Sequence, residues 1–181
     1  FGVVRADQIL LTIGATGLLL LTFVPTTIIY FSLVLAGLGL VGPLVLTNVM
    51  FAQVIDEDEL KTGVRREAVY FGMNAFITKP AQSIALALPA ILLTLAHFVP
   101  RNALGEIQPQ THPTDVDFAI RAFMGLIPAI ALYIEVLILQ FYPLKGEYLT
   151  KVQKEILVLH KEKHDKLMEL EKQQKPDRNQ Q

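Results

Sequence analysis

A single lysine lies deep inside an apolar part of this 181-residue chain. Lys79 stands eleven residues beyond Ala68, in a run from Ala68 to Val99 that is too long and too apolar for a helix in a soluble core. At 1.5 Å of rise per helical residue, the ammonium group would lie about 16 Å into a membrane, close to its midplane. A charge there costs about 2.5–3.5 kcal/mol by insertion scales, so it usually has a partner or a function.

Polar side chains accompany Lys79 on one face of the expected helix. Asn74, Thr78 and Gln82 follow one another four residues apart, which places them on the same side of a helix. We expect this face to line a cavity or a helix–helix interface rather than lipid. The functional interpretation is binding or coupling of a substrate or ion near the midplane. The alternative is a structural lysine that is permanently paired.

Glu135 is the candidate intramembrane acid. It lies eight residues before Pro143, about 12 Å from the end of the last apolar segment. The third and fourth apolar segments run antiparallel, so Glu135 and Lys79 are expected within about one helical turn of each other in depth. Two interpretations stay open: a structural Lys79–Glu135 bridge, or a Glu135 that serves elsewhere or stays protonated. We prefer the second.

A loop of mixed charge, DEDELKTGVRRE, precedes the segment that carries Lys79. One interpretation is a solvated turn. The other is a cytoplasmic gate, in which Arg65 and Arg66 form ion pairs in one conformation and break them in another. The candidate gate residues are Asp56, Asp58, Lys61, Arg65, Arg66 and Glu67.

No metal site, cofactor or enzyme is predicted. The chain has no Cys, which excludes disulfides and thiolate metal sites. His160 and His164 have the spacing of metal ligands, but their surroundings are rich in lysine and no third ligand is evident. The sequence carries no glycine-rich phosphate loop, nucleophile elbow or carboxylate dyad. The net charge of −1 averages two unlike regions and does not indicate a nucleic-acid partner.

The distribution of charge predicts an all-α membrane protein. The chain is 52% hydrophobic, and eight of its sixteen Lys and Arg lie between Lys151 and Arg178. A soluble domain spreads its charges over its whole surface. A helix needs about 20 apolar residues to cross a bilayer, and within residues 1–144 four segments qualify: about 7–24, 26–55, 68–99 and 117–144. Residues 145–172 are expected to form an amphipathic helix, and 173–181 a disordered tail.

Basic residues set the expected orientation. The loop at 56–67 holds Lys61, Arg65 and Arg66, the loop between the third and fourth segments holds only Arg101, and nine basic residues follow Leu144. Short loops rich in Lys and Arg stay in the cytoplasm, so both ends of the segment and the helix at 145–172 are expected there.

Small residues within the apolar segments predict close helix packing. Gly14, Gly17, Gly37, Gly39 and Gly42 are expected to let backbones approach in the absence of water. Hinges at Gly42–Pro43 or Lys79–Pro80 are the alternative use of these positions. The chain begins at Phe1, and we expect it to be the C-terminal part of a longer polypeptide.

The stretch from Val54 to Ala81 resembles the glycoside–pentoside–hexuronide:cation symporters, the melibiose-permease-like branch of the major facilitator superfamily. In that family an acidic loop with Lys-Thr-Gly-x-Arg-Arg-Glu precedes the eleventh transmembrane helix, and a lysine lies midway along that helix. A Tyr-Pro-Leu sequence ends the last helix, as Tyr142-Pro143-Leu144 does here. The matching positions are Asp56, Asp58, Glu59, Lys61, Thr62, Gly63, Arg65, Arg66, Glu67, Asn74 and Lys79.

The resemblance implies that the four segments are helices nine to twelve of a twelve-helix fold in the plasma membrane. It implies cation-coupled symport, driven by Na⁺ or H⁺, of a sugar or related small solute by alternating access. Lys79 would then face acidic residues of the N-terminal half of the same transporter. Gln53, Ala68 and Ala75 depart from the family pattern, so the substrate can differ. The alternatives are a lipid-type solute transporter of the same superfamily and a non-transporting membrane scaffold that acts through its tail helix.

Overall fold

The computed structural model describes residues 2–174, and every regular element within them is helical. Four helical stretches are long and apolar enough to cross a membrane, which confirms the predicted all-α membrane architecture. The elements are α1 (Val3–Phe23), the 3₁₀ turn η1 (Thr26–Ile28), α2 (Ile29–Thr62), α3 (Glu67–Leu95), α4 (Pro113–Arg121), the π-helical turn η2 (Ala122–Leu126), α5 (Ile127–Leu139) and α6 (Gly146–Gln174).

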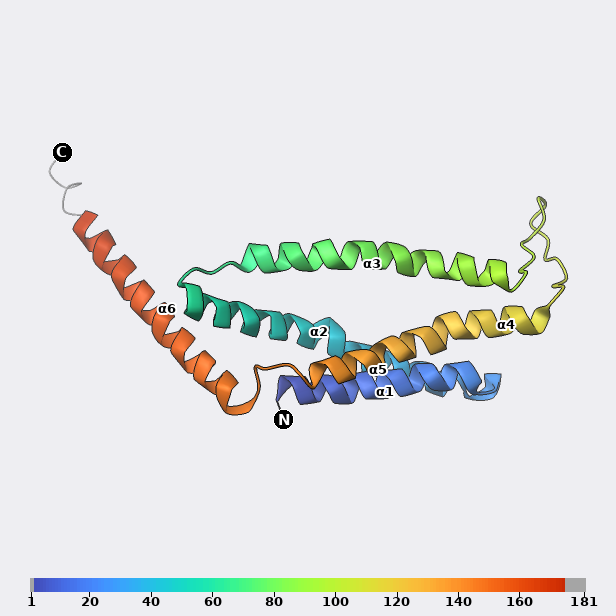
Figure 1. Ribbon diagram of the computed structural model, residues 1–181, viewed down its shortest axis with the longest axis horizontal. Helices are drawn as coiled ribbons and strands as arrows, with labels where there is room; N and C mark the ends of the chain where they lie inside the picture. The colour runs from blue at the N-terminus through green and yellow to red at the C-terminus, as the bar shows by residue number, and fades with distance from the viewer. Residues whose placement is uncertain (1, 175–181) are drawn as a thin grey trace.

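Helix α1 is the centre of the packing, with α2 along one side and α5 along another (Figure 1). Glycines bring α1 and α2 together. A Cβ on Gly14 would lie 2.9 Å from the Cα of Gly39, and one on Gly17 would lie 2.9 Å from the carbonyl oxygen of Ser32. Such distances leave no room for a side chain, so these glycines pack backbone against backbone.

Helix α2 is longer than the expected span. It continues seven residues beyond Ile55, to Thr62, where Gly63 ends it in a left-handed conformation with φ of 74°. Glycine adopts this conformation without the strain of a Cβ, which makes it a common helix terminator. The acidic part of the loop at 56–67 is therefore the last turns of a helix.

The fourth span also differs from the sequence-based bounds. It begins at Pro113 and ends at Leu139, and the π-helical turn at 122–126 interrupts it where Gly125 meets α1. A Cβ on Gly125 would lie 2.6 Å from the carbonyl oxygen of Leu18. A π-helical turn is a rare insertion in a helix, and apolar periodicity does not reveal one.

Helix α3 lies apart from the α1–α2–α5 packing for most of its length (Figure 1). It ends at Leu95 rather than residue 99, and none of its residues is buried. Its main packing is at its C-terminal end, where Leu92 and Leu93 meet a small core formed by Ala96, Val116 and Ala119.

Helix α6 covers residues 146–174 and follows the segment around Tyr142. The Tyr142 hydroxyl donates to the carbonyl oxygen of Met50 on α2 at 3.1 Å. The first half of α6 packs against α2 and buries Val152 and Ile156. The predicted helix after the last span is thus present, beginning one residue later and ending two residues later than expected. Residues 175–181 of the tail predicted as disordered lie outside the described residues.

Candidate functional site

The polar face of α3 lies on the exposed surface of the chain. Asn74 and Thr78 are partly exposed, and Lys79 and Gln82 are exposed. The Thr78 hydroxyl donates to the backbone carbonyl oxygen of Asn74 at 2.8 Å. This bond does not involve the side-chain amide of Asn74. Within residues 2–174, the side-chain nitrogen of Lys79 makes no hydrogen bond or ion pair, although its backbone carbonyl accepts from Ser83 at 3.2 Å.

Glu135 and Lys79 stand on helices that do not contact each other. Glu135 is partly buried on α5, which packs against α1. Next to it, the backbone carbonyl of Val136 accepts from the Gln8 side chain at 3.3 Å. The described residues contain no Lys79–Glu135 ion pair, so the bridge that the sequence left open is not formed in this conformation.

The charged residues at 56–67 pair with one another across the turn between α2 and α3. Arg65 contacts three carboxylates: Nη1 donates to Asp56 at 3.0 Å and to Glu59 at 3.2 Å, and Nε donates to Glu67 at 3.1 Å. Arg66 holds both carboxylate oxygens of Asp58, with Nε 2.9 Å from Oδ2. A guanidinium is suited to such paired contacts because its donors form a planar fork.

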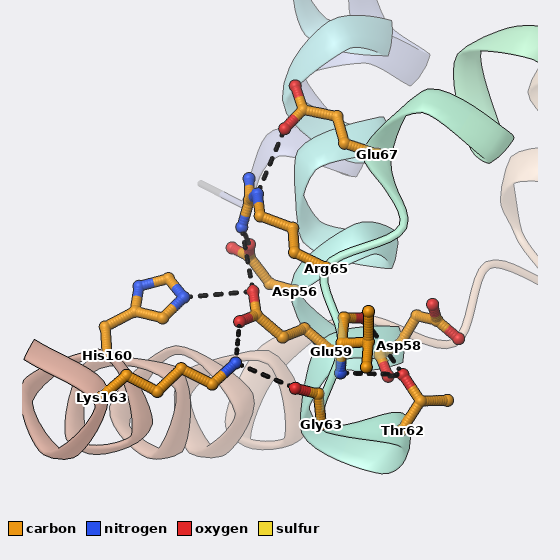
Figure 2. Close-up of polar contacts among 10 residues, drawn as sticks. Asp56, Asp58, Glu59, Thr62, Gly63, Arg65, Glu67, His160 and Lys163 are labelled. Atoms are coloured by element: carbon orange, nitrogen blue, oxygen red, sulfur yellow. Dashed lines mark hydrogen bonds and ion pairs between the residues drawn. The ribbon is translucent and has the colours of Figure 1, made fainter. Parts of the chain in front are cut away.

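Glu59 extends this cluster to the tail helix, as Figure 2 shows. Lys163 Nζ donates to Oε1 of Glu59 at 2.6 Å, and His160 Nε2 lies 3.1 Å from Oε2. Lys163 also donates to the carbonyl oxygen of Gly63 at 3.0 Å, where the C-terminal end of α2 favours a cation. The Glu59 side chain is only 3% exposed. We call Asp56, Asp58, Glu59, Arg65, Arg66, Glu67, His160 and Lys163 the charged cluster.

A second contact joins the same two helices. Glu57 accepts from Lys61 one turn later and from the Tyr148 hydroxyl of α6, each at 2.6 Å. The last turns of α2 are therefore held to α6 by Glu57 and Glu59 together.

The electrostatics of the charged cluster favour its ionised form. The Lys163 ammonium, followed by His160 and Arg65, lowers the pKa of Glu59 from 4.5 to about 2 against the opposing effect of burial. Asp56 and Glu67 raise the pKa of Arg65, and Arg66 lowers the pKa of Asp58. Hydrogen bonds to a charged form stabilise that form.

Sequence reasoning did not assign the partners of this cluster on α6. Val152, Ile156, His160 and Lys163 follow one another at helical spacing, so they share a face. The first two residues pack against α2, which brings the last two to Glu59. This spacing was the signal in the sequence that could have identified His160 and Lys163 as partners of Glu59. Among residues 2–174 no three His, Asp, Glu or Cys side chains are grouped so as to hold a metal ion.

Sequence reasoning also gave no role to Asp7. This residue stands near the start of α1, is 0% exposed, and has no hydrogen-bond partner for either carboxylate oxygen within the described part of the chain. Its position at the edge of an apolar segment was typical of an ordinary helix boundary.

Comparison with known proteins places these features in a family. The model for the family described as MFS/sugar transport protein matches residues 2–146. The chain is 28% identical over 147 residues to the glucuronide carrier protein homolog of Escherichia coli, covering 80% of this chain and 30% of that protein. It is 31% identical over 125 residues to the uncharacterized symporter YjmB of Bacillus subtilis, covering 67% and 26% of the two chains.

A third relative is the uncharacterized symporter sll1374 of Synechocystis, 26% identical over 137 residues, or 76% of this chain and 25% of that protein. The chain thus spans only 25–30% of the length of these relatives. No solved structure matches it significantly. Because the family model covers most of the chain, from the first residues of α1 to the start of α6, the chain belongs to the MFS/sugar transport protein family.

Proposed function

We propose that this chain is part of a secondary active transporter that couples the uptake of a sugar or related small solute to Na⁺ or H⁺. The two relatives named as symporters and the one named as a glucuronide carrier homolog support this class of activity. Glucuronides are therefore the first solutes to test. In this proposal the four spans are helices nine to twelve of the full transporter and cross the plasma membrane. Helix α6 then lies in the cytoplasm.

The observation that carries the proposal is the polar face of α3. Asn74, Thr78, Lys79 and Gln82 lie midway along an apolar helix without burial by the rest of the described chain. Such a face needs water, a solute or another polar surface beside it, because exposure of Lys79 to lipid at the midplane is costly. In our proposal it lines a central site facing the N-terminal half of the transporter, and Lys79 balances the charge of acidic residues that bind the coupling cation.

The charged cluster acts in this proposal as the cytoplasmic gate. Its ion pairs join the last turns of α2, the turn before α3 and the tail helix α6. Alternating access requires contacts that differ between the two conformations. The cluster supplies contacts at one end of α3 that can break when the helix moves.

The scaffold alternative requires permanent partners for the polar face of α3. Lys79 has none within residues 2–174, which favours transport. The tail helix is also packed against α2 through Val152 and Ile156 rather than free for a partner over its first half. A lipid-type solute remains compatible with the same helices, so the uptake experiment includes a lysophospholipid beside the sugar.

Uptake by the full-length transporter tests the proposal. In proteoliposomes, an inward Na⁺ or H⁺ gradient should drive accumulation of p-nitrophenyl β-D-glucuronide or of a simple sugar, and should not drive movement of a lysophospholipid. Lys79→Ala should lower gradient-driven accumulation by at least about 100-fold, the effect of losing about 2.7 kcal/mol of coupling. Lys154→Ala, which removes an exposed lysine of α6, is the matched control and should accumulate solute like the unmodified protein. Equal accumulation by Lys79→Ala and Lys154→Ala would contradict the assigned role of Lys79.

A further inference from the structure

A cavity opens where helix α1 begins, beside the turn that joins α5 to α6 (Figure 1). Its volume is about 350 Å³, within the range of about 300–1,000 Å³ that is usual for small-molecule sites. Arg5 of α1, Gln53 of α2 and Lys145 of the turn before α6 contribute its polar lining. None of the described residues that line this cavity is acidic, so the cavity favours an anion.

The ammonium group of Lys145 is held in place at the end of α5. Its Nζ donates to the carbonyl oxygens of Leu139 and Gln140, at 2.9 and 2.7 Å, and an ammonium group has a further N–H to donate. Among residues 2–174, neither Arg5 nor Lys145 forms an ion pair with a carboxylate. The positive charges at this cavity are therefore not neutralised by the described part of the chain.

Gln53 adds a buried donor that lacks an acceptor. The residue is only 6% exposed, and its Nε2 donates no hydrogen bond within the described residues. Its Oε1 lies 3.5 Å from the Tyr142 hydroxyl, which donates to the carbonyl oxygen of Met50 at 3.1 Å. Buried polar groups are hydrogen-bonded in the large majority of cases. Because Gln53 lines the cavity, a ligand with acceptor oxygens would satisfy this amide.

The first turn of α1 also favours negative charge. The first N–H groups of a helix have no acceptor within it, and this turn has neither a side-chain cap nor an acidic residue. The helix macrodipole makes such an end attractive to anions. Asp7, the next acid along α1, does not line the cavity. Its Oδ1 lies against α2 instead, where a Cβ on Gly42 would approach it to 2.6 Å.

We propose that this cavity binds the headgroup of an anionic phospholipid from the membrane leaflet on the side of α6. Arg5 and Lys145 attract the phosphate, and Gln53 donates to one of the headgroup oxygens. The bound lipid would thus join α1, α2 and the turn before α6. This role is separate from the solute and cation site beside Lys79, and it requires only that the spans cross a membrane.

The position and the walls of the cavity favour a lipid over free phosphate. Helix α1 begins at Val3 and α5 ends at Leu139, so the cavity adjoins the ends of two spans, where the headgroups of a bilayer lie. Leu144 and Leu149 give it apolar walls, which suit the carbon atoms of a lipid rather than an inorganic ion. Basic pockets between transmembrane helices are typical sites for anionic headgroups.

Native mass spectrometry of the full-length transporter in detergent tests the proposal. The protein is mixed with dioleoylphosphatidylglycerol or with dioleoylphosphatidylcholine, whose headgroup has no net charge. We expect phosphatidylglycerol to be retained preferentially, and Arg5→Gln and Lys145→Gln each to weaken its binding about 5-fold, the effect of losing one basic contact. Gln53→Leu should weaken it as well, and Arg5→Lys, which keeps the charge, should restore most of it. Lys154→Gln, at an exposed lysine of α6, is the matched control and should bind like the unmodified protein.

The proposal is overturned if Arg5→Gln and Lys145→Gln retain phosphatidylglycerol as well as Lys154→Gln does, or if phosphatidylcholine is retained equally. The same holds if no lipid is retained, which would mean that another part of the transporter fills the cavity. Displacement of the lipid by an equal concentration of inorganic phosphate would assign the cavity to free phosphate instead. Arg5 is exposed, so its variants should fold. Because binding is measured without uptake, a failure of transport would overturn the proposed function and leave this result standing.

Discussion

Glu59 joins three parts of the chain through its two carboxylate oxygens. Arg65 reaches it from the turn after α2, and His160 and Lys163 reach it from α6. The Glu59 side chain is almost fully buried, while its three partners are about half exposed. Without these contacts the Glu59 carboxylate would have no solvation, whereas its partners would still be hydrated. A buried charge that loses its partners is costly.

Neutralising Glu59 should therefore loosen the tail helix. We expect Glu59→Gln to weaken the docking of α6 by about 1–2 kcal/mol, since charged hydrogen bonds contribute about 1.5–3 kcal/mol and the exposed partners regain water. Spin labels at Val64 and Leu167, which are 61% and 59% exposed, would report a longer and broader distance distribution. Glu162→Gln on the exposed face of α6 is the control and should leave the distances unchanged.

Acid should have the same effect as the Glu59→Gln substitution. The pKa of Glu59 is about 2 in the docked state and 4.5 when the group is free, so its contribution is complete above pH 4.5 and is lost as pH falls toward 2. Arg65, whose pKa is raised by Asp56 and Glu67, keeps its charge across this window. The spin-label distance should lengthen between pH 4.5 and 2 in the unmodified protein and should not respond through this group in Glu59→Gln. A flat profile in both proteins would contradict the role of Glu59.

At the scale of elements, α1 and α2 are held together by glycines that face each other. The sequence predicted this packing at Gly14, Gly17, Gly37, Gly39 and Gly42. All of these except Gly37 would clash with the neighbouring helix if they carried a Cβ, so the prediction was wrong for Gly37. Gly37 has nothing within 4 Å, so glycine alone does not identify a contact. A glycine of α2 contacts α1 only if it lies on the face of α2 that points toward α1.

Gly39→Ala and Gly37→Ala form a matched pair on α2. A Cβ on Gly39 would lie 2.7 Å from the carbonyl oxygen of Leu10 and would also press on Gly14, so Gly39→Ala should cost about 1–3 kcal/mol of stability. Gly37→Ala should cost nothing or stabilise the helix by about 0.4–1 kcal/mol. Unfolding of the purified transporter in detergent with increasing denaturant measures both. Equal losses for the two variants would show that α1 and α2 do not meet at Gly39.

Apolar length predicted the four spans, because a membrane needs about 20 apolar residues and the chain supplies four such segments. The ends of the helices were less predictable. Helix α2 runs on to Thr62 through a polar segment that bonds within itself, as Lys61 does with Glu57. The sequence left the loop at 56–67 open between a solvated turn and a gate of ion pairs. Its partners on α6 were not predictable, because they depend on where a helix about 100 residues later docks. Asp7 was missed for the same reason: only packing shows that it is enclosed.

At the scale of the whole molecule, the asymmetry between α3 and the other spans has functional meaning. Helices α1, α2 and α5 each bury small residues, whereas α3 buries none of its residues. Figure 1 shows α3 apart from the other three helices for most of its length. Its polar and apolar faces are both open to further partners. In the proposed transporter the apolar face meets lipid, and the polar face, with Lys79, meets an aqueous site shared with the N-terminal half.

Accessibility of the two faces of α3 to water tests this account most directly. This chain has no Cys of its own, so single cysteines can be placed at Gln82 on the polar face and at Ile84 on the apolar face in the full-length transporter freed of other thiols. A membrane-impermeant thiol reagent should label Gln82→Cys, with labelling slowed by the transported solute, and should leave Ile84→Cys unlabelled. Labelling of Ile84→Cys alone, or of neither position in any conformation, would contradict an aqueous site beside Lys79.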